Sequence, residues 1–308
     1  MVIAQQPNGL PRHPGGLCVA MGMFDGVHLG HQHVVRSALL DAAAFGARTA
    51  VITFDPHPLA VVKPGHAPLL LQSLPQRLRA LEALGADAVL VNQFTPEFAR
   101  RTGEDFIRTL AREAGPIRSF SVGEGFHFGF QRSGNVPLLQ SLGAELGFDT
   151  HACAAVSIGT ERISSSLVRQ SLRAGRLKPV AEYLGRPYSL AGVVQTGDRL
   201  GRQLGFPTAN LDVRGLELPP FGVYAVRVRH GSRTLPAALN LGVRPTVTRA
   251  GELRCEIHLL DFTEDLYGQE IEAAFVAKLR DEQKFPTPAA LQTQIAQDVA
   301  AARALLTA

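Results

Sequence analysis

Two histidines near the start of the chain are spaced so that they could act together on a phosphoryl group. His28 and His31 stand in the string GMFDGVHLGH, residues 22–31. A helical turn would bring both imidazoles to one side, where two donors could stabilise the charge that builds during phosphoryl transfer. Gly22 and Gly30 would let the backbone approach a phosphate. Taken alone, the pair could also be a surface or helix-capping feature.

A serine cluster precedes an arginine at a second predicted helix start. Ser164, Ser165 and Ser166 would supply hydroxyls and free amides there, and Arg169 follows within about one turn. The guanidinium could bind a pyrophosphate through two parallel hydrogen bonds. Taken alone, the pattern favours an ordinary N-cap with a surface arginine.

A glycine-rich segment, GDRLGRQLGFPTAN, covers residues 197–210. Gly197, Gly201 and Gly205 could wrap a phosphate with backbone amides. The segment is not a Walker A sequence, because no G-K-[ST] closes it. In a barrel such a loop is more often a simple turn.

A carboxylate interrupts an apolar run at residues 255–260, CEIHLL. Strand alternation would put Glu256, His258 and Leu260 on one face. A carboxylate among apolar strand residues is costly unless it is paired or functional. An exposed-face glutamate is the alternative.

The first part of the chain alternates strand and helix signals. Strands are predicted over residues 17–21, 49–54, 88–91 and 117–122, and helices over residues 34–45, 74–84, 104–114, 164–174 and 179–184. Such alternation implies βαβ units and a parallel sheet covered on both faces. The histidine turn lies between the first strand and the first long helix, where open parallel sheets bind ligands.

The pattern changes after Gly185-Arg186-Pro187. Strands are predicted over residues 188–194, 223–228, 235–240, 254–260 and 271–275, followed by a helix over residues 288–306. Short strands separated by turn-forming residues predict a small antiparallel barrel or sandwich. We therefore expect an N-terminal extension over residues 1–16, a first domain over 17–184 and a second over 185–308.

Composition sets the broad class. A length of 308 residues favours two domains. With 31 basic and 27 acidic residues, the chain is not basic enough for charge alone to indicate a nucleic-acid-binding surface. Cys18, Cys153 and Cys255 are too few for a disulfide framework and are expected to be buried thiols. No apolar run is long enough to cross a membrane, and residues 1–16 lack a signal-peptide core. We expect a cytoplasmic protein with no membrane or nucleic-acid partner.

Taken together, these strings resemble the bacterial bifunctional riboflavin kinase/FAD synthetase family. The amino-terminal module of that family belongs to the nucleotidylyltransferase superfamily. Three strings are similar to it: GMFDGVHLGHQ at 22–32, FDPHP at 54–58 and ISSSLVR at 163–169. Four strings are similar to the family's kinase module: GFPTAN at 205–210, NLGVRPT at 240–246, CEIHLLDF at 255–262 and LRDEQKF at 279–285.

The resemblance implies a fold, a reaction and a set of residue roles. The fold is α/β, with a doubly wound parallel-sheet nucleotidylyltransferase domain before a small antiparallel β-barrel that ends in a helix. The reaction is ATP-dependent phosphorylation of riboflavin to FMN, then adenylylation of FMN to FAD and pyrophosphate. Glu256 would be the kinase's general base, and His28, His31 and Arg169 would stabilise charge in adenylyl transfer. Thr208 and Asn210 would bind Mg²⁺. The remaining implied binding residues are Gly22, Phe24, Asp25, Gly30, Ser164, Ser165, Ser166, Gly197, Gly201, Arg202, Gly205, Pro207 and Arg280.

One position departs from the family pattern. Residues 122–129, VGEGFHFG, resemble the family's V-G-x-D/N-F-x-F-G loop, but Gly125 stands where an acidic or amide side chain is expected. His127 in this loop is interpreted as structural. The departure keeps open a kinase whose first module has weak or no adenylylation, and a non-enzymatic flavin- or nucleotide-binding regulator is the second alternative.

Overall fold

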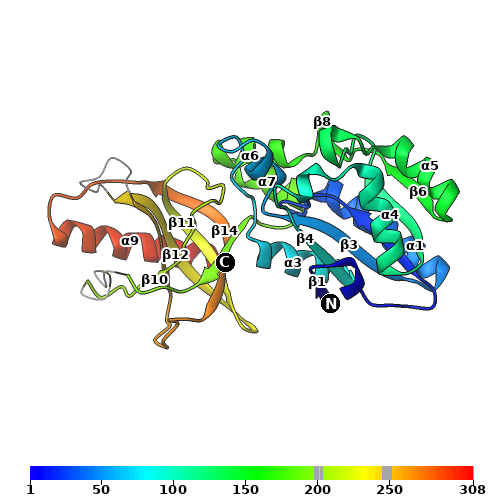
Figure 1. The fold of residues 1–308 in the computed structure, drawn as a ribbon. Coiled ribbons are helices and arrows are strands. Elements are labelled where there is room, and N and C mark those ends of the chain that lie inside the picture. Colours follow the sequence, from blue (N-terminus) through cyan, green and yellow to red (C-terminus); the bar gives the residue numbers. More distant parts are fainter. Residues whose placement is uncertain (198–200, 202–203, 245–251, 308) are drawn as a thin grey trace. The chain divides into compact units, whose positions relative to one another are not determined.

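The computed structural model describes residues 1–197, 201, 204–244 and 252–307. The chain forms two compact units, Met1–Leu167 and Val168–Ala308, drawn in Figure 1. Among the described residues, no helix combines the length and the apolar character needed to span a membrane.

The first unit is built on a six-stranded sheet in which every pairing is parallel. The strands in spatial order are β1 (Val2–Ala4), β4 (Ala88–Gln93), β3 (Arg48–Asp55), β2 (Leu17–Met21), β5 (Ile117–Gly123) and β6 (Asp149–Cys153). The chain leaves β2 toward β3 and β4, and later returns to β5 on the other side of β2. This reversal of direction is the switch point at which open α/β sheets bind ligands.

Helices cover both faces of this sheet (Figure 1). They are α1 (Leu29–Phe45), α3 (Leu74–Ala83), α4 (Gly103–Ala114) and α5 (Val136–Leu146). Two further helices are the short α2 (Pro58–Val62) and α6 (Ser165–Arg173), which continues into the second unit. Along β2, Val19 packs with residues of α4 and α5, whereas Ala20 packs with residues of α1 and α3. Two cores on opposite faces confirm the predicted doubly wound architecture. A short hairpin, β7 (Ser157–Ile158) and β8 (Glu161–Arg162), precedes α6.

The second unit contains α7 (Leu177–Leu184) and an antiparallel six-stranded sheet. Its spatial order is β10 (Ala209–Asn210), β13 (Glu252–Leu259), β12 (Arg233–Arg244), β11 (Gly222–His230), β14 (Glu270–Asp281) and β9 (Ser189–Val193). A single antiparallel bridge between Gln195 and Asn210 joins the two edges, so the sheet curls into the predicted small barrel. Helix α9 (Pro288–Thr307) packs Ala302 and Leu306 against Ala225 and Ala238.

Two features concern the expected limits of the domains. Residues 1–16, expected as an extension, contribute β1, which pairs with β4. The compact units divide after Leu167, and the expected domain boundary at residue 185 stays a prediction.

Candidate active sites

The turn between β2 and α1 brings its two histidines into contact. His28 caps α1, and its Nδ1 accepts a hydrogen bond of 3.3 Å from the backbone N–H of His31. The two imidazoles stack with ring centroids 3.7 Å apart. A Cβ at Gly30 would lie 3.2 Å from the His28 ring, so glycine leaves the ring the room it needs. The rings therefore lie on one side of the turn, as their spacing predicts.

These histidines line a cavity of about 300 Å³, here called the histidine pocket. It is formed by the turn after β2 and by the segments that follow β5 and β6. Its lining includes Gly22, Phe24, His28, Gly30, His31, Glu124, Gly125 and Ile163. The pocket therefore opens at the carboxyl ends of the strands that flank the switch point. A Cβ at Gly125 would meet no atom within 4 Å.

The serine cluster begins helix α6 beside the histidine turn. The Ser164 hydroxyl accepts a bond of 3.2 Å from Leu167 N–H, and the Ser165 hydroxyl donates one of 3.0 Å to the carbonyl of Asp25. Arg169 lies one turn further along the helix and is buried. Both serines thus have structural partners, which agrees with the N-cap interpretation and leaves any ligand role a prediction.

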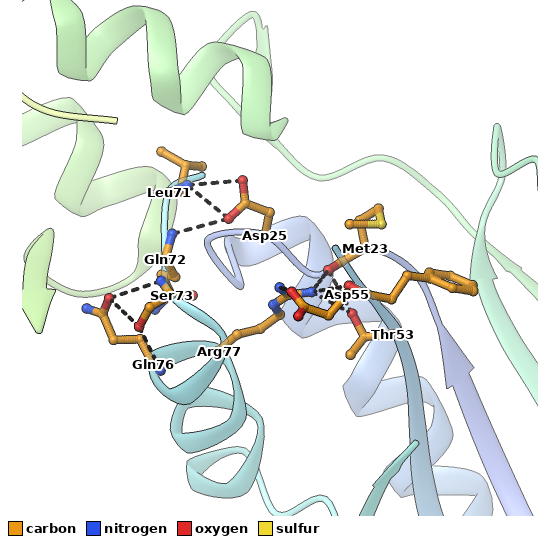
Figure 2. Close-up of polar contacts among 10 residues, drawn as sticks. Met23, Asp25, Thr53, Asp55, Leu71, Gln72, Ser73, Gln76 and Arg77 are labelled. Atoms are coloured by element: carbon orange, nitrogen blue, oxygen red, sulfur yellow. Dashed lines mark hydrogen bonds and ion pairs between the residues drawn. The ribbon is translucent and has the colours of Figure 1, made fainter. Parts of the chain in front are cut away.

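Asp25 is tied to a neighbouring segment. Its carboxylate is 2% exposed and accepts hydrogen bonds from the backbone N–H groups of Leu71 and Gln72 at 2.9–3.2 Å (Figure 2). The structure therefore gives Asp25 an anchoring role in the turn. The sequence could not indicate this, because the partners lie more than forty residues away.

A larger apolar cavity of about 490 Å³ adjoins the histidine pocket. This apolar pocket was not predicted, although the FDPHP and FHF strings that contribute to it were noted. Its lining includes Met23, Phe54, Pro58, Phe94, Phe98, Phe106, Phe126 and Phe128. Met23 and Phe126 line both pockets. One cavity can therefore hold a flat apolar ring while the other holds a charged group next to it.

In the second unit, a cavity of about 290 Å³ surrounds Glu256, and we call it the glutamate pocket. Strand β13 presents Arg254, Glu256 and His258 to it, and β14 presents Arg280. Leu260, predicted to share this face, instead follows the end of β13 and is buried. The face is therefore more polar than predicted.

Glu256 is paired within this pocket. Its carboxylate oxygen lies 3.2 Å from Nη1 of Arg254, and its side chain is 27% exposed. The register of β13 sets Glu256 opposite Asn210 of β10 and Asn240 of β12. Sequence reasoning missed Arg254, although the same alternation that selected Glu256 places residue 254 on its face.

Arg280 is held by the terminal helix. Its guanidinium donates to both carboxylate oxygens of the buried Asp298 at 2.8–3.1 Å, and its Cζ lies 5.6 Å from the ring centre of Phe285. A forked pair and a ring contact fix the guanidinium plane. Arg280 therefore forms a rigid wall of the glutamate pocket.

A second cavity of about 320 Å³, the tyrosine pocket, is also lined by residues just before β10. It is lined by residues that include Pro207, Thr208, Phe262 and Tyr267. Thr208 lines both this pocket and the glutamate pocket. Two ligands could therefore meet at Thr208. Arg202, a predicted binding residue, lies outside the described residues.

Two family models match the chain, FAD synthetase over residues 10–167 and riboflavin kinase over residues 184–306. The chain is 38% identical over 296 residues to the bifunctional riboflavin kinase/FMN adenylyltransferase of Pseudomonas fluorescens, covering 96% of this chain and 94% of that protein. It is 39% identical over 289 residues to the protein of the same name from Escherichia coli strain K12, covering 94% and 92%. The chain belongs to the bifunctional riboflavin kinase/FMN adenylyltransferase family.

The fold has also been seen in a solved structure. A protein from Streptococcus pneumoniae, described as a macrolide-efflux protein, matches with a TM-score of 0.82 and 26% sequence identity, covering 98% of both chains. The likeness extends over both units that the two family models match.

Magnesium is the metal that the sequence resemblance leads us to expect at Thr208 and Asn210. Thr208 and Asn210 offer hydroxyl and amide oxygens, which are the hard ligands that Mg²⁺ prefers. Both side chains are partly exposed. The backbone at Gly197 approaches Asn210 so closely that a Cβ there would lie 2.5 Å from its Nδ2. The residues present therefore fit an ion that keeps several waters and binds nucleotide oxygens.

The three cysteines are buried free thiols, as predicted. Burial raises the pKa of Cys18, Cys153 and Cys255 above the usual thiol value. Because the thiolate is the reactive form, none of the three is suited to nucleophilic chemistry at neutral pH.

Proposed function

We propose that this chain converts riboflavin to FMN in its second unit and FMN to FAD in its first, using one ATP in each step. The observation that carries the kinase assignment is that Thr208 lines two adjoining pockets. A phosphoryl group held at Thr208 by a nucleotide in the tyrosine pocket would face an acceptor in the glutamate pocket.

In the kinase step, Glu256 is the proposed general base. It would take the proton from the terminal ribityl hydroxyl of riboflavin, whose oxygen then attacks the γ-phosphorus of ATP. The bond from that phosphorus to the bridging oxygen breaks, and ADP leaves. Arg254, whose Nη1 lies 3.2 Å from the carboxylate oxygen, would orient Glu256 for this step. Arg280 and Phe285 would hold the flavin side.

Thr208 and Asn210 are the proposed protein ligands of magnesium in this step. Bound with the nucleotide, the ion would neutralise charge on the phosphates. The glycine-rich loop would supply backbone amides to the same phosphates.

In the adenylyl-transfer step, the isoalloxazine ring of FMN would occupy the apolar pocket and ATP the histidine pocket. An oxygen of the FMN phosphate attacks the α-phosphorus of ATP, and pyrophosphate leaves. The attacking oxygen is already anionic, so no general base is needed. His28, His31 and Arg169 would stabilise the charge on the transferred group, and positioning by the two pockets supplies the rest.

The cytoplasm is the proposed compartment, which agrees with three reduced, buried thiols and with the use of ATP. Riboflavin, FMN and ATP are the proposed small-molecule partners.

One assay tests the proposal against its two rivals. The full chain is incubated with riboflavin, ATP and Mg²⁺, and the products are separated by chromatography. FAD is expected. FMN alone would indicate a kinase with an inactive first unit, the outcome that Gly125 keeps open. No product would indicate a binding protein and would overturn the proposal.

A further inference from the structure

Arg77 on α3 is a completely buried arginine behind the two pockets of the first unit. Its Nη1 donates to the carbonyls of Met23 at 3.1 Å and Phe54 at 3.0 Å, and to the hydroxyl of Thr53 at 3.0 Å (Figure 2). Its Nη2 lies 3.7 Å from the Asp55 carboxylate. A single guanidinium thus joins the turn after β2 to the end of β3.

Burying this cation is costly unless hydrogen bonds and opposite charges compensate. Burial lowers the pKa of Arg77, whereas the carboxylates of Asp25 and Asp55 favour its charged form. An apolar side chain of similar volume could fill the same core space without this desolvation cost. The arginine therefore calls for an explanation beyond packing.

The connection between the two segments runs in both directions. Arg77 reaches from α3 to the carbonyl of Met23, and Asp25 reaches back to Leu71 and Gln72 just before α3. Between these contacts, a capping box fixes the start of the helix, with Ser73 N–H donating to the Gln76 side chain at 3.2 Å. Figure 2 shows this closed set of contacts.

The atoms that Arg77 holds belong to the pocket walls. Met23 lines both the histidine pocket and the apolar pocket, and Phe54 lines the apolar pocket. Thr53 strengthens the contact, because its hydroxyl donates to the Met23 carbonyl at 2.9 Å while it accepts from Arg77. A shift of the Met23 carbonyl would change the separation of the two pockets.

We infer that Arg77 is a positioning residue for adenylyl transfer, which sets the distance between the flavin phosphate and the α-phosphate of ATP by fixing Met23 and the end of β3. The inference rests on the proposed adenylyl transfer in the first unit. A displacement of about 1 Å in the reacting groups can cost about 10²-fold in rate. Arg77 acts through the backbone of Met23 and Phe54 and touches neither pocket itself.

Substitutions in the full-length protein test this role. Arg77→Lys keeps the charge but loses the planar fork, and we expect kcat for FAD formation from FMN to fall by about 10–100-fold. The KM for FMN should rise by only about threefold, because positioning is felt mainly in the transition state. The rate of riboflavin phosphorylation by the same preparation should stay unchanged. This activity is the control that the variant chain is folded.

Two further variants separate positioning from packing. Thr53→Val removes the hydroxyl that links Arg77 to Met23 and should lower kcat in the same direction. Thr53→Ser restores the hydroxyl and should recover most of it. Arg48→Lys is the matched control, because Arg48 pairs with Asp87 at the opposite end of β3 and its side chain is 53% exposed. It should behave as the unsubstituted protein.

The inference is overturned if Arg77→Lys lowers only the melting temperature and leaves kcat per folded molecule within about twofold of normal. A twofold change in kcat is far smaller than the 10–100-fold fall that we expect. It is also overturned if Thr53→Ser is as defective as Thr53→Val. If the unsubstituted chain makes no FAD from FMN, the proposed function fails. The inference is then overturned with it, because a positioning role in adenylyl transfer requires that the transfer takes place.

Discussion

The imidazole rings of His28 and His31 stack with their centroids 3.7 Å apart, and both face the pocket at the carboxyl ends of the central strands. His28 also accepts the first hydrogen bond of α1 from the backbone of His31. The pair is therefore held by the helix start itself, so that both rings present a fixed polar surface to the histidine pocket.

The double substitution His28→Ala with His31→Ala should abolish most FAD formation from FMN. Loss of preorganised donors in such sites costs about 10²–10³-fold in kcat. FMN formation from riboflavin should persist, because both histidines lie in the first unit. Separate assays from FMN and from riboflavin check this. Loss of both activities in a folded protein would contradict the assignment of one reaction to each unit.

Glu256→Gln should lower kcat of riboflavin phosphorylation by about 10²–10⁴-fold, the usual contribution of a general base. The substitution keeps the shape of the side chain and its contact with Arg254 but removes its ability to accept a proton. KM values should change little, and conversion of supplied FMN to FAD should be unaffected. A near-normal kcat with a raised KM would instead show that Glu256 only binds.

Gly125→Asn or Gly125→Asp should raise the rate of FAD formation or lower the FMN concentration it requires. The site has room, because a Cβ there meets nothing within 4 Å, and the new side chain would add a polar group to the histidine pocket. A gain of about 3–10-fold is expected, the value of one modest hydrogen bond. Gly125→Ala, which adds the Cβ alone, is the control. Equal rates for all variants would mean that another group already makes this contact.

Tyr224 should make the second unit sensitive to alkaline pH. Burial, with a smaller contribution from the Asp281 carboxylate, raises the pKa of Tyr224 from 10.0 to about 12. The folded chain therefore keeps a proton that the unfolded chain loses above pH 10, so this stabilisation is complete below pH 10 and disappears as pH rises toward 12. The loss should be about 3 kcal/mol. Denaturant unfolding at several pH values measures it, and Tyr224→Phe should give a flatter dependence. An unchanged slope in that variant would assign the pH effect to other groups.

The sequence alone determined the residue types at the sites and the periodic elements that carry them. The spacing of His28 and His31 before a long amphipathic segment indicated a strand–turn–helix unit, and β2, α1 and β3 lie where the patterns predict. Local signals suffice there, because alternation and helix periodicity are properties of consecutive residues. Short elements carry too little of that signal, which is why no pattern in the sequence predicts β1, with its three residues.

Only the tertiary structure decided which residues face a ligand and which hold the site together. Asp25 reads in sequence as part of the nucleotide turn, yet its carboxylate binds Leu71 and Gln72. Arg77 stands in an ordinary helical segment, but the fold buries it against Met23. Such contacts join residues 46 to 54 positions apart. They depend on how β3 and α3 pack together, and no periodicity in the chain encodes that packing.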